Sequence, residues 1–229
     1  MANVLITGAN RGIGLALTRL YAEDGDTVFA FCRDPQSAEK LNDLAEHSGG
    51  RVRVHAMDVG DERSIKAAAG AVGDLPIDIL INNAGVRGGD NQTLENTDTS
   101  EWIEAFKVMT IGPFRVVQVF LGNLRAAKNP KIMAISTQIA ATTWPAGGSY
   151  VYASTKAALN RVTLSLARDL KDQVIVTMIH PGWVKTDMGG QAADITPEES
   201  ARGIRKVIAS VTKADSGKFY KWNGDIHPW

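Results

Sequence analysis

The stretch Thr7-Gly-Ala-Asn-Arg-Gly-Ile-Gly14 joins an apolar run, Asn3 to Thr7, to a helical pattern that begins at Gly12. A glycine-rich turn in this position brings backbone N–H groups and a helix N-terminus to a pyrophosphate. We expect Gly8 to permit the sharp turn, Gly12 to let the backbone approach the ligand, and Gly14 to let the helix pack close to the strand. The stretch predicts the first βαβ unit of a dinucleotide-binding domain. A plain strand-to-helix turn is the alternative for a glycine triplet taken alone.

Short β-branched runs alternate with longer helical patterns along the rest of the chain. This order predicts an α/β fold in which one parallel sheet of about seven strands is covered by helices on both faces. The expected strands are Asn3 to Thr7, Thr27 to Arg33, Arg51 to Met57, Ile77 to Asn82, Lys131 to Ser136, Val174 to His180 and Lys218 to Trp222. The expected helices are Gly12 to Asp24, Pro35 to Glu46, Glu62 to Val72, Ser100 to Ala127, Tyr150 to Asp172 and Pro197 to Thr212.

Composition narrows the class of protein. The chain has 229 residues, of which 44% are hydrophobic and 22% charged, and this balance predicts a single domain over residues 1–229. The formal net charge of zero argues against nucleic acid and anionic membranes as partners. A single cysteine, Cys32, leaves no internal disulfide, and no Cys/His cluster has metal-ligand spacing.

The first residues enter an apolar strand without the basic start, long apolar run and cleavage site of a secretory signal. No apolar run approaches the roughly 20 residues of a membrane span. We therefore expect a cytoplasmic protein.

The end of the second strand indicates which dinucleotide binds. An acidic side chain there would bind the adenosine ribose, whereas a cation would pair with a 2′-phosphate. The strand ends Phe31-Cys-Arg33 without a carboxylate at its tip, and Arg11 lies within the glycine turn. These two cations favour NADP(H) over NAD, with solvated surface arginines as the alternative.

A tyrosine and a lysine lie four residues apart in the predicted helix Tyr150 to Asp172. Residues at this spacing share a helix face, so Tyr152 is expected to present its phenol beside the ammonium of Lys156. A nearby cation stabilises a phenolate, and we expect the pKa of Tyr152 to fall by roughly 1–3 units. The pair predicts a tuned acid/base, and a solvated helix edge is the alternative.

Together with Asn82-Asn-Ala-Gly85 after the fourth strand, the glycine turn and Tyr152-x3-Lys156 resemble the short-chain dehydrogenase/reductases. Asp58-Val59 and Pro181-Gly182 match two further family positions. The similarity extends over essentially the whole chain and implies a Rossmann-type doubly wound sheet. The segments 181–188 and 217–229 resemble the branch that contains the C-factor signalling protein and sniffer-type carbonyl reductases.

The resemblance implies a mechanism and a set of site residues. Hydride passes between the nicotinamide and a carbonyl carbon, while Tyr152 exchanges the proton and Lys156 holds the nicotinamide ribose. In the family, a hydroxyl at the end of the fifth strand stabilises the developing alkoxide. Matching without gaps places this hydroxyl at Thr137, and Ser136 is the second candidate. The alternative is that either residue only caps the strand. The implied cofactor-binding residues are Gly8, Asn10, Arg11, Gly12, Ile13, Gly14, Arg33, Asp58, Val59, Asn83, Ala84, Gly85, Tyr152, Lys156, Pro181, Gly182, Val184 and Thr186.

One position departs from the family pattern. The family carries an asparagine in its long fourth helix, three residues before a glycine, and Met109 stands in that place. The asparagine is thought to kink the helix and anchor a water that leads to the lysine, whereas a thioether is only a weak acceptor. Turnover could be reduced, or the relay rebuilt through Thr110. Met109 as ordinary core filler is the alternative.

Side chains after the strand ends are expected to shape the substrate pocket. Their aromatic and thioether character favours a small, fairly apolar aldehyde or ketone. These residues are Val86, Ile139, Trp144, Tyr150, Trp183 and Met188.

Apolar residues on several faces of the two long central helices predict, by analogy with the family, a homodimer or homotetramer. The sequence thus favours an NADPH-dependent carbonyl reductase that also runs in reverse. A cofactor-binding signalling or sensor protein with weak or incidental turnover is the alternative.

Overall fold

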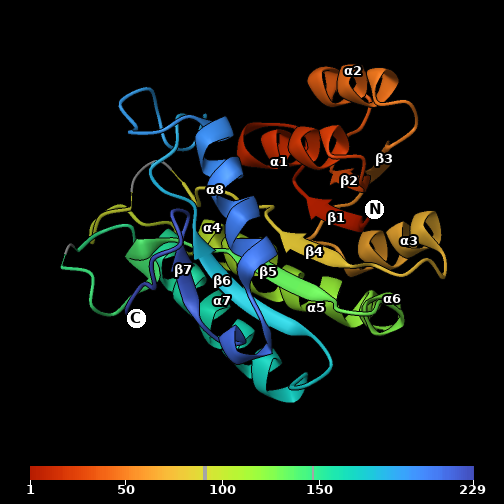
Figure 1. Cartoon of the computed structure of the whole chain (residues 1–229). Coiled ribbons are helices and arrows are strands. Elements are labelled where there is room, and N and C mark those ends of the chain that lie inside the picture. Colours follow the sequence, from red (N-terminus) through yellow and green to blue (C-terminus); the bar gives the residue numbers. More distant parts are fainter. Residues whose placement is uncertain (90–91, 146) are drawn as a thin grey trace.

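A computed structural model describes residues 1–89, 92–145 and 147–229. It contains a seven-stranded sheet in the order β3-β2-β1-β4-β5-β6-β7, and every pairing between these strands is parallel (Figure 1). The order confirms the predicted doubly wound α/β fold. The strands are β1 (Asn3–Thr7), β2 (Thr27–Cys32), β3 (Val52–Ala56), β4 (Ile79–Asn82), β5 (Lys131–Ile135), β6 (Ile175–His180) and β7 (Phe219–Lys221).

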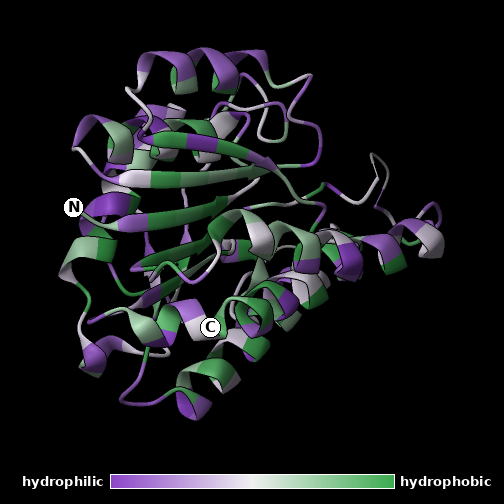
Figure 2. Ribbon diagram, turned by 90° about the vertical axis from the view of Figure 1, so that its right-hand side faces the viewer, coloured by the Kyte–Doolittle hydropathy of each residue, from purple (hydrophilic) through white to green (hydrophobic). Residues whose placement is uncertain are grey.

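Helices cover both faces of the sheet, and the strand side chains alternate between two cores. Val4 and Ile6 of β1 pack in one cluster with residues of three helices, α1 (Gly12–Glu23), α2 (Glu39–His47) and α8 (Pro197–Ser210). Leu5 points to the opposite cluster, which includes residues of α3 (Glu62–Val72), α5 (Gly112–Val119) and α7 (Tyr150–Asp169). This division follows from the two-residue period of a strand. Figure 2 shows the largely hydrophobic strands between the helical layers.

The chain reverses direction across the sheet beside β1. From β1 it adds β2 and β3 on one side and then returns to place β4 on the other. In open α/β sheets, a ligand crevice forms outside the carboxyl ends of the strands at such a switch point. The glycine turn after β1 and the residues after β4 therefore face the same space.

The predicted continuous helix from Ser100 to Ala127 is wrong. The segment divides into α4 (Thr99–Phe106), a π-helical turn (Lys107–Ile111), α5, and α6 (Leu121–Ala126). Pro113 has no N–H to bond to the carbonyl of Met109, four residues earlier, and its ring clashes with that carbonyl in a regular helix. A wide turn immediately before Gly112 removes this conflict. Met109 therefore lies in the irregular part of the segment.

Two other helices differ from the prediction by three or more residues at one end. Residues 35–38 form a turn in which the carboxylate of Asp34 accepts from the N–H of Gln36, so α2 begins only at Glu39. The helix α7 stops at Asp169, before the predicted end at Asp172, which adopts a left-handed φ of 68°.

The expected start of α8 is confirmed. The Thr196 hydroxyl accepts from the N–H of Glu199 at 3.1 Å, and the Glu199 carboxylate accepts from the N–H of Thr196 at 2.8 Å. This capping box satisfies two backbone donors at once. None of the helices within the described ranges is long and apolar enough to cross a membrane.

Removal of the capping box should destabilise the protein without changing its fold. We expect Thr196→Ala to lower the free energy of unfolding by about 1 kcal/mol. In a chain of this length the melting temperature should then fall by about 2–4 °C, measured by thermal unfolding. Lys206→Ala, an exposed change on the same helix, should stay within about 0.5 kcal/mol of the wild type. Equal melting temperatures for the two variants would show that the capping box contributes nothing.

Candidate active site

A cleft of about 1090 Å³ lies at the carboxyl ends of the strands. Its walls come from the glycine turn, the residues after β2 to β6, and the first turns of α7. Of the predicted catalytic and cofactor-binding residues, only Gly14 is absent from the lining, because it is buried beneath the turn. Those that line the cleft are Gly8, Asn10, Arg11, Gly12, Ile13, Arg33, Asp58, Val59, Asn83, Ala84, Gly85, Thr137, Tyr152, Lys156, Pro181, Gly182, Val184 and Thr186.

The glycine turn is held by the residues that follow β4. Asn83 donates from Nδ2 to the carbonyls of Thr7 and Gly8 at 2.9 and 3.0 Å. The Thr7 hydroxyl accepts from the N–H groups of Asn83 and Ala84 at 3.0 and 3.1 Å. Gly8 has a φ of 67°, and a Cβ on Gly14 would collide with the Gly8 carbonyl oxygen. The turn therefore presents its backbone to the cleft in a fixed position, as a pyrophosphate site requires.

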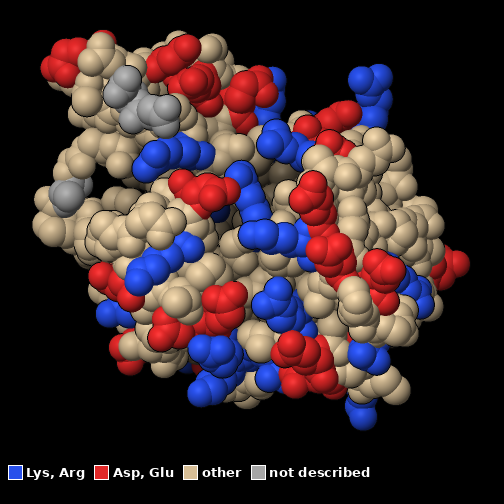
Figure 3. All heavy atoms as spheres, turned by 90° about the horizontal axis from the view of Figure 1, so that it is seen from above, with Lys and Arg blue, Asp and Glu red and all other residues tan. Residues whose placement is uncertain are grey.

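Cations gather at the end of the cleft that follows β2. On the face shown in Figure 3, Lys and Arg side chains surround a hollow, with acidic side chains beside them. Four exposed cations line the cleft between the glycine turn and the start of α2, namely Arg11, Arg19, Arg33 and Lys40. The sequence interpretation missed Arg19 and Lys40 because they lie within helices, away from the strand tips. The chemistry of this wall fits an anionic group.

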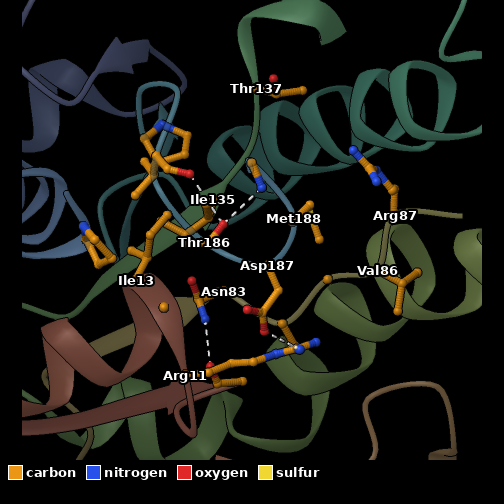
Figure 4. Close-up of a pocket in the computed structure, with 18 of the residues that line it drawn as sticks. Arg11, Ile13, Asn83, Val86, Arg87, Ile135, Thr137, Thr186, Asp187 and Met188 are labelled. Atoms are coloured by element: carbon orange, nitrogen blue, oxygen red, sulfur yellow. Dashed lines mark hydrogen bonds and ion pairs between the residues drawn. The ribbon is translucent and has the colours of Figure 1, made fainter. Parts of the chain in front are cut away.

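Arg11 also contacts the opposite wall. Its guanidinium pairs with the carboxylate of Asp187 at 2.8 Å, across the pocket shown in Figure 4. Both side chains are largely exposed, at 63% and 78%. Exposed pairs of this kind contribute about 0–1 kcal/mol, so Arg11 can exchange this partner for a ligand at little cost.

Tyr152 and Lys156 lie one turn apart on α7 and both line the cleft. Lys156 is 4% exposed and donates from Nζ to the carbonyl of Ile135 at 2.7 Å. Burial lowers the pKa of Lys156 to about 8. The expected fall in the pKa of Tyr152 is wrong for the protein alone, because burial raises that pKa to about 12. Both groups are pushed toward their neutral forms.

The two candidate hydroxyls after β5 occupy different environments. Ser136 is buried and donates to Oδ1 of Asn160 at 2.5 Å. Thr137 begins a short 3-10 helix, Gln138–Ala140, where its Oγ1 accepts a long 3.4 Å bond from the N–H of Ile139. The Ser136 proton is thus committed to Asn160, whereas the Thr137 hydroxyl retains its proton for another acceptor.

Met109 is fully buried beside the Tyr152 and Lys156 side chains. It packs in a cluster with Ala105 and Val151, and a Cβ on Gly85 would lie 3.7 Å from its Sδ and 3.9 Å from Nζ of Lys156. The hydroxyl of Thr110 donates to the carbonyl of Thr155 at 2.8 Å and so ties the π turn to α7. Core packing is therefore part of the role of Met109.

Most of the residues that were expected to shape the substrate pocket line the cleft. Val86, Ile139, Trp144, Trp183 and Met188 line the cleft, but Tyr150 does not and is 39% exposed. Tyr150 is the first residue of α7, and the helical rotation that brings Tyr152 inward turns Tyr150 away.

Polar residues of the same cleft were missed, among them Arg87, Gln92 and His180. Burial is the main cause that lowers the pKa of His180 to about 4, with His227 and Lys221 adding to the effect, so its ring is neutral at physiological pH. The sequence did carry a signal for His180, because it lies at the end of a predicted strand, where cleft residues are expected. Gln92 lies in an irregular stretch whose path the sequence did not reveal. No group of three or more His, Cys, Asp or Glu in the described ranges could hold a metal ion.

Comparison with known proteins identifies the family. Residues 2–196 match the family model for short chain dehydrogenase. C-signal of Myxococcus xanthus is 37% identical over 158 residues, which cover 67% of this chain and 93% of that protein.

Solved structures that resemble the whole chain include two carbonyl reductases. The NADPH-bound carbonyl reductase from chicken fatty liver has 34% identity and a TM-score of 0.93, covering 100% of this chain and 99% of its own. The carbonyl reductase Sniffer of D. melanogaster has 26% identity and a TM-score of 0.90, with 100% of both chains covered. The glycine turn, the cations and the Tyr/Lys pair of the cleft fit the dinucleotide that this fold binds. The chain therefore belongs to the short-chain dehydrogenase/reductase family, in the branch of C-signal and the carbonyl reductases, and is an NAD(P)-dependent oxidoreductase acting on CH–OH or carbonyl groups.

Proposed function

We propose that this protein is an NADP(H)-dependent reductase of small, fairly apolar aldehydes or ketones, with cofactor binding and catalysis in one domain. The observation that carries the proposal is that Tyr152 and Lys156 line the same cleft as the glycine turn. The cofactor supplies the hydride, and the cleft residues orient the reactants and move the proton.

Each polar residue has a role that its surroundings support. The backbone of the glycine turn holds the pyrophosphate. Lys156, when charged, donates to the nicotinamide ribose hydroxyls. Tyr152 donates its phenolic proton to the carbonyl oxygen of the substrate: the phenol O–H bond breaks as the new alcohol O–H bond forms. The Thr137 hydroxyl donates a hydrogen bond to the same oxygen while negative charge develops on it.

The pKa of Tyr152 favours the reductive direction. With its pKa raised to about 12, the phenol carries its proton at neutral pH and is ready to donate it. Alcohol oxidation requires the phenolate, which is a minor species at that pH. The same groups support the reverse reaction in the fraction of molecules that carries the phenolate.

The cations near β2 support a preference for NADP(H) over NAD. Arg11 and Arg33 line the cleft, and Arg19 and Lys40 add positive charge to the same wall. Asp34 follows Arg33, but its carboxylate accepts from the N–H of Gln36 within its own turn. The chicken-liver carbonyl reductase is described as NADPH-bound, which agrees with this assignment.

The apolar walls support a carbonyl substrate of modest size. Trp144, Trp183 and Met188 offer aromatic and thioether surface beside the proposed proton donor. Two carbonyl reductases among the similar structures are consistent with this class.

Two further predictions concern the cellular location and the oligomeric state of the enzyme. The cytoplasm is the proposed location, and a homodimer or homotetramer is the proposed assembly. Apolar side chains on the outer surface of α4, the π turn and α5 support an assembly: Ile103, Ile111 and Phe114 are 59%, 40% and 37% exposed.

A cofactor-binding signalling or sensor protein is the second candidate. The similarity to C-signal and the presence of Met109 beside Lys156 favour it. In that case turnover on carbonyl compounds would be weak or incidental.

Loss of the Tyr152 hydroxyl should abolish reduction. We expect Tyr152→Phe to lower kcat about 10²–10⁴-fold, because the proton donor is removed, while the Kd for NADPH stays within about twofold. NADPH oxidation at 340 nm, with a panel of small aldehydes and ketones, and fluorescence titration of NADPH measure the two quantities.

The matched control is Tyr21→Phe, which removes a buried hydroxyl that has no hydrogen-bond partner in the described structure and lies outside the cleft. It should leave kcat unchanged. If wild-type protein binds NADPH but turns over none of the carbonyls, the sensor alternative replaces the reductase.

Removal of Arg33 should weaken selection for the 2′-phosphate. We expect Arg33→Ala to raise the KM for NADPH about 10–100-fold, as for the loss of a hydrogen bond between charged groups, and to change the KM for NADH far less. Steady-state kinetics with both cofactors measures the ratio. Lys171→Ala removes an exposed positive charge elsewhere and should leave both KM values unchanged. An equal rise for both cofactors would contradict the assignment.

Cofactor binding should weaken as Lys156 loses its proton. The pKa of Lys156 is lowered to about 8, so the ammonium is present below that pH and is lost as the pH rises through it. We expect the Kd for NADPH to be constant from pH 6.5 to 7.5 and to rise about threefold or more by pH 9.5. Fluorescence titration across this range measures it. In Lys156→Arg, which stays charged, the rise in the Kd for NADPH near pH 8 should disappear. If the Kd rises equally in both proteins, a group other than Lys156 causes the rise.

A further inference from the structure

The helix that carries Tyr152 begins without a cap of its own. The first N–H groups of a helix have no partner within it and are usually satisfied by the side chain of the residue before the helix. In α7 that residue is Ser149, which adopts a left-handed conformation with a φ of 51° and makes no side-chain capping bond. The N–H of Tyr152 occupies the third helical position, which an N-cap side chain normally serves.

Gln92 satisfies this N–H from 60 residues upstream. Its Oε1 accepts from the N–H of Tyr152 at 3.0 Å. Its Nε2 donates to the carbonyls of Arg87 and Gly89 at 2.8 and 3.2 Å. The amide orientation is fixed by these partners, because only the oxygen can accept from an N–H and only the nitrogen can donate to two carbonyls.

The same amide fastens the loop after β4 to the first turn of α7. A Cβ on Gly88 would collide with the side chain of Val151, so the backbone at Gly88 packs directly against the helix start. Gln92 is half-buried and lines the cleft. It therefore joins the backbone of Arg87 and Gly89 to the backbone of Tyr152.

We propose that Gln92 is a positioning residue. By holding the backbone at Tyr152, it keeps the phenol in the position from which it donates its proton. The inference rests on the proposed function, in which Tyr152 is the proton donor. Other ties to α7 reach later residues: Trp102 donates to Oγ of Ser154 at 2.8 Å, and Thr110 donates to the Thr155 carbonyl. Gln92 holds the backbone at Tyr152 itself, so fraying of the first turn moves the phenol before it moves Lys156.

Kinetics of Gln92 variants tests the proposal. We expect Gln92→Ala to lower kcat about tenfold, because a proton donor displaced by a fraction of an ångström transfers its proton less efficiently. The Kd for NADPH should stay within about twofold of wild type. Gln92→Glu keeps an acceptor for the Tyr152 N–H, at a helix N-terminus that favours negative charge, but loses the two donations to the carbonyls of Arg87 and Gly89. It should therefore restore kcat in part, to within about threefold of wild type.

The matched control removes a cap from another helix. The exposed carboxylate of Asp98 accepts from the N–H of Ser100 at the start of α4. Asp98→Ala should destabilise the fold to a similar degree as Gln92→Ala but leave kcat unchanged. A kcat of Gln92→Ala within twofold of wild type, or an equal loss in the Glu and Ala variants, overturns the proposal, as does a tenfold loss in Asp98→Ala.

Amide hydrogen exchange separates this inference from the proposed function. In Gln92→Ala the amide of Tyr152 should exchange about tenfold faster than in wild type, and in Gln92→Glu it should remain protected. If wild-type protein reduces no carbonyl, the reductase proposal fails, and exchange alone decides whether Gln92 holds this residue. Equal protection in wild type and Gln92→Ala overturns the role of Gln92 even in an active enzyme.

Discussion

The hydrogen bonds between Thr7 and Asn83 are the interaction on which the cleft depends. They join the end of β1 to the end of β4, the two strands on either side of the point where the chain reverses across the sheet. Asn83 donates to the carbonyls of the glycine turn, and Thr7 accepts from the backbone after β4, so each segment completes the hydrogen bonding of the other. Because unpaired backbone groups are costly near a buried strand end, this reciprocal arrangement fixes the turn without using any group of a ligand.

The sheet and its helical layers could be predicted because one signal repeats along the chain. Most of the apolar runs are short and rich in β-branched residues, and the apolar residues of β1 are all buried, with Val4 and Ile6 facing one layer and Leu5 the other. The break between α4 and α5 was missed because an apolar pattern continues through it. Pro113 was the available signal, since a residue without an N–H cannot continue the hydrogen bonding of a regular helix. The turn at Asp34 was missed for a similar reason, as its carboxylate offers the backbone a local alternative to the helix.

The site residues that motifs identify were placed together in the cleft, but their energetics could not be predicted from spacing. Tyr152 and Lys156 were expected to act as a phenol and a fixed cation. Spacing along a helix gives proximity, whereas a pKa depends on burial, which is set by residues distant in sequence such as Met109 and Ile135. The role of Gln92 could not be predicted either, because it also depends on a residue distant in sequence. Its contact with Tyr152 spans 60 residues and passes through an irregular segment, where neither periodicity nor a short motif gives a signal.

Burial on this scale also decides how the Tyr/Lys pair can work. A change in the pKa of Lys156 from 10.5 to about 8 corresponds to roughly 3 kcal/mol in favour of the neutral amine. The only hydrogen bond that its Nζ makes within the described residues is to the Ile135 carbonyl, and the thioether of Met109 lies on the same side of Gly85. Additional acceptors, such as ribose hydroxyls, would stabilise the ammonium more than they stabilise the amine. Acceptors of this kind would raise the pKa of Lys156 back toward its usual range and so hold its charge more firmly. Without the cofactor, the ammonium of Lys156 has one acceptor in the described part of the chain, the Ile135 carbonyl, and a pKa lowered to about 8, whereas the phenol of Tyr152 stays neutral.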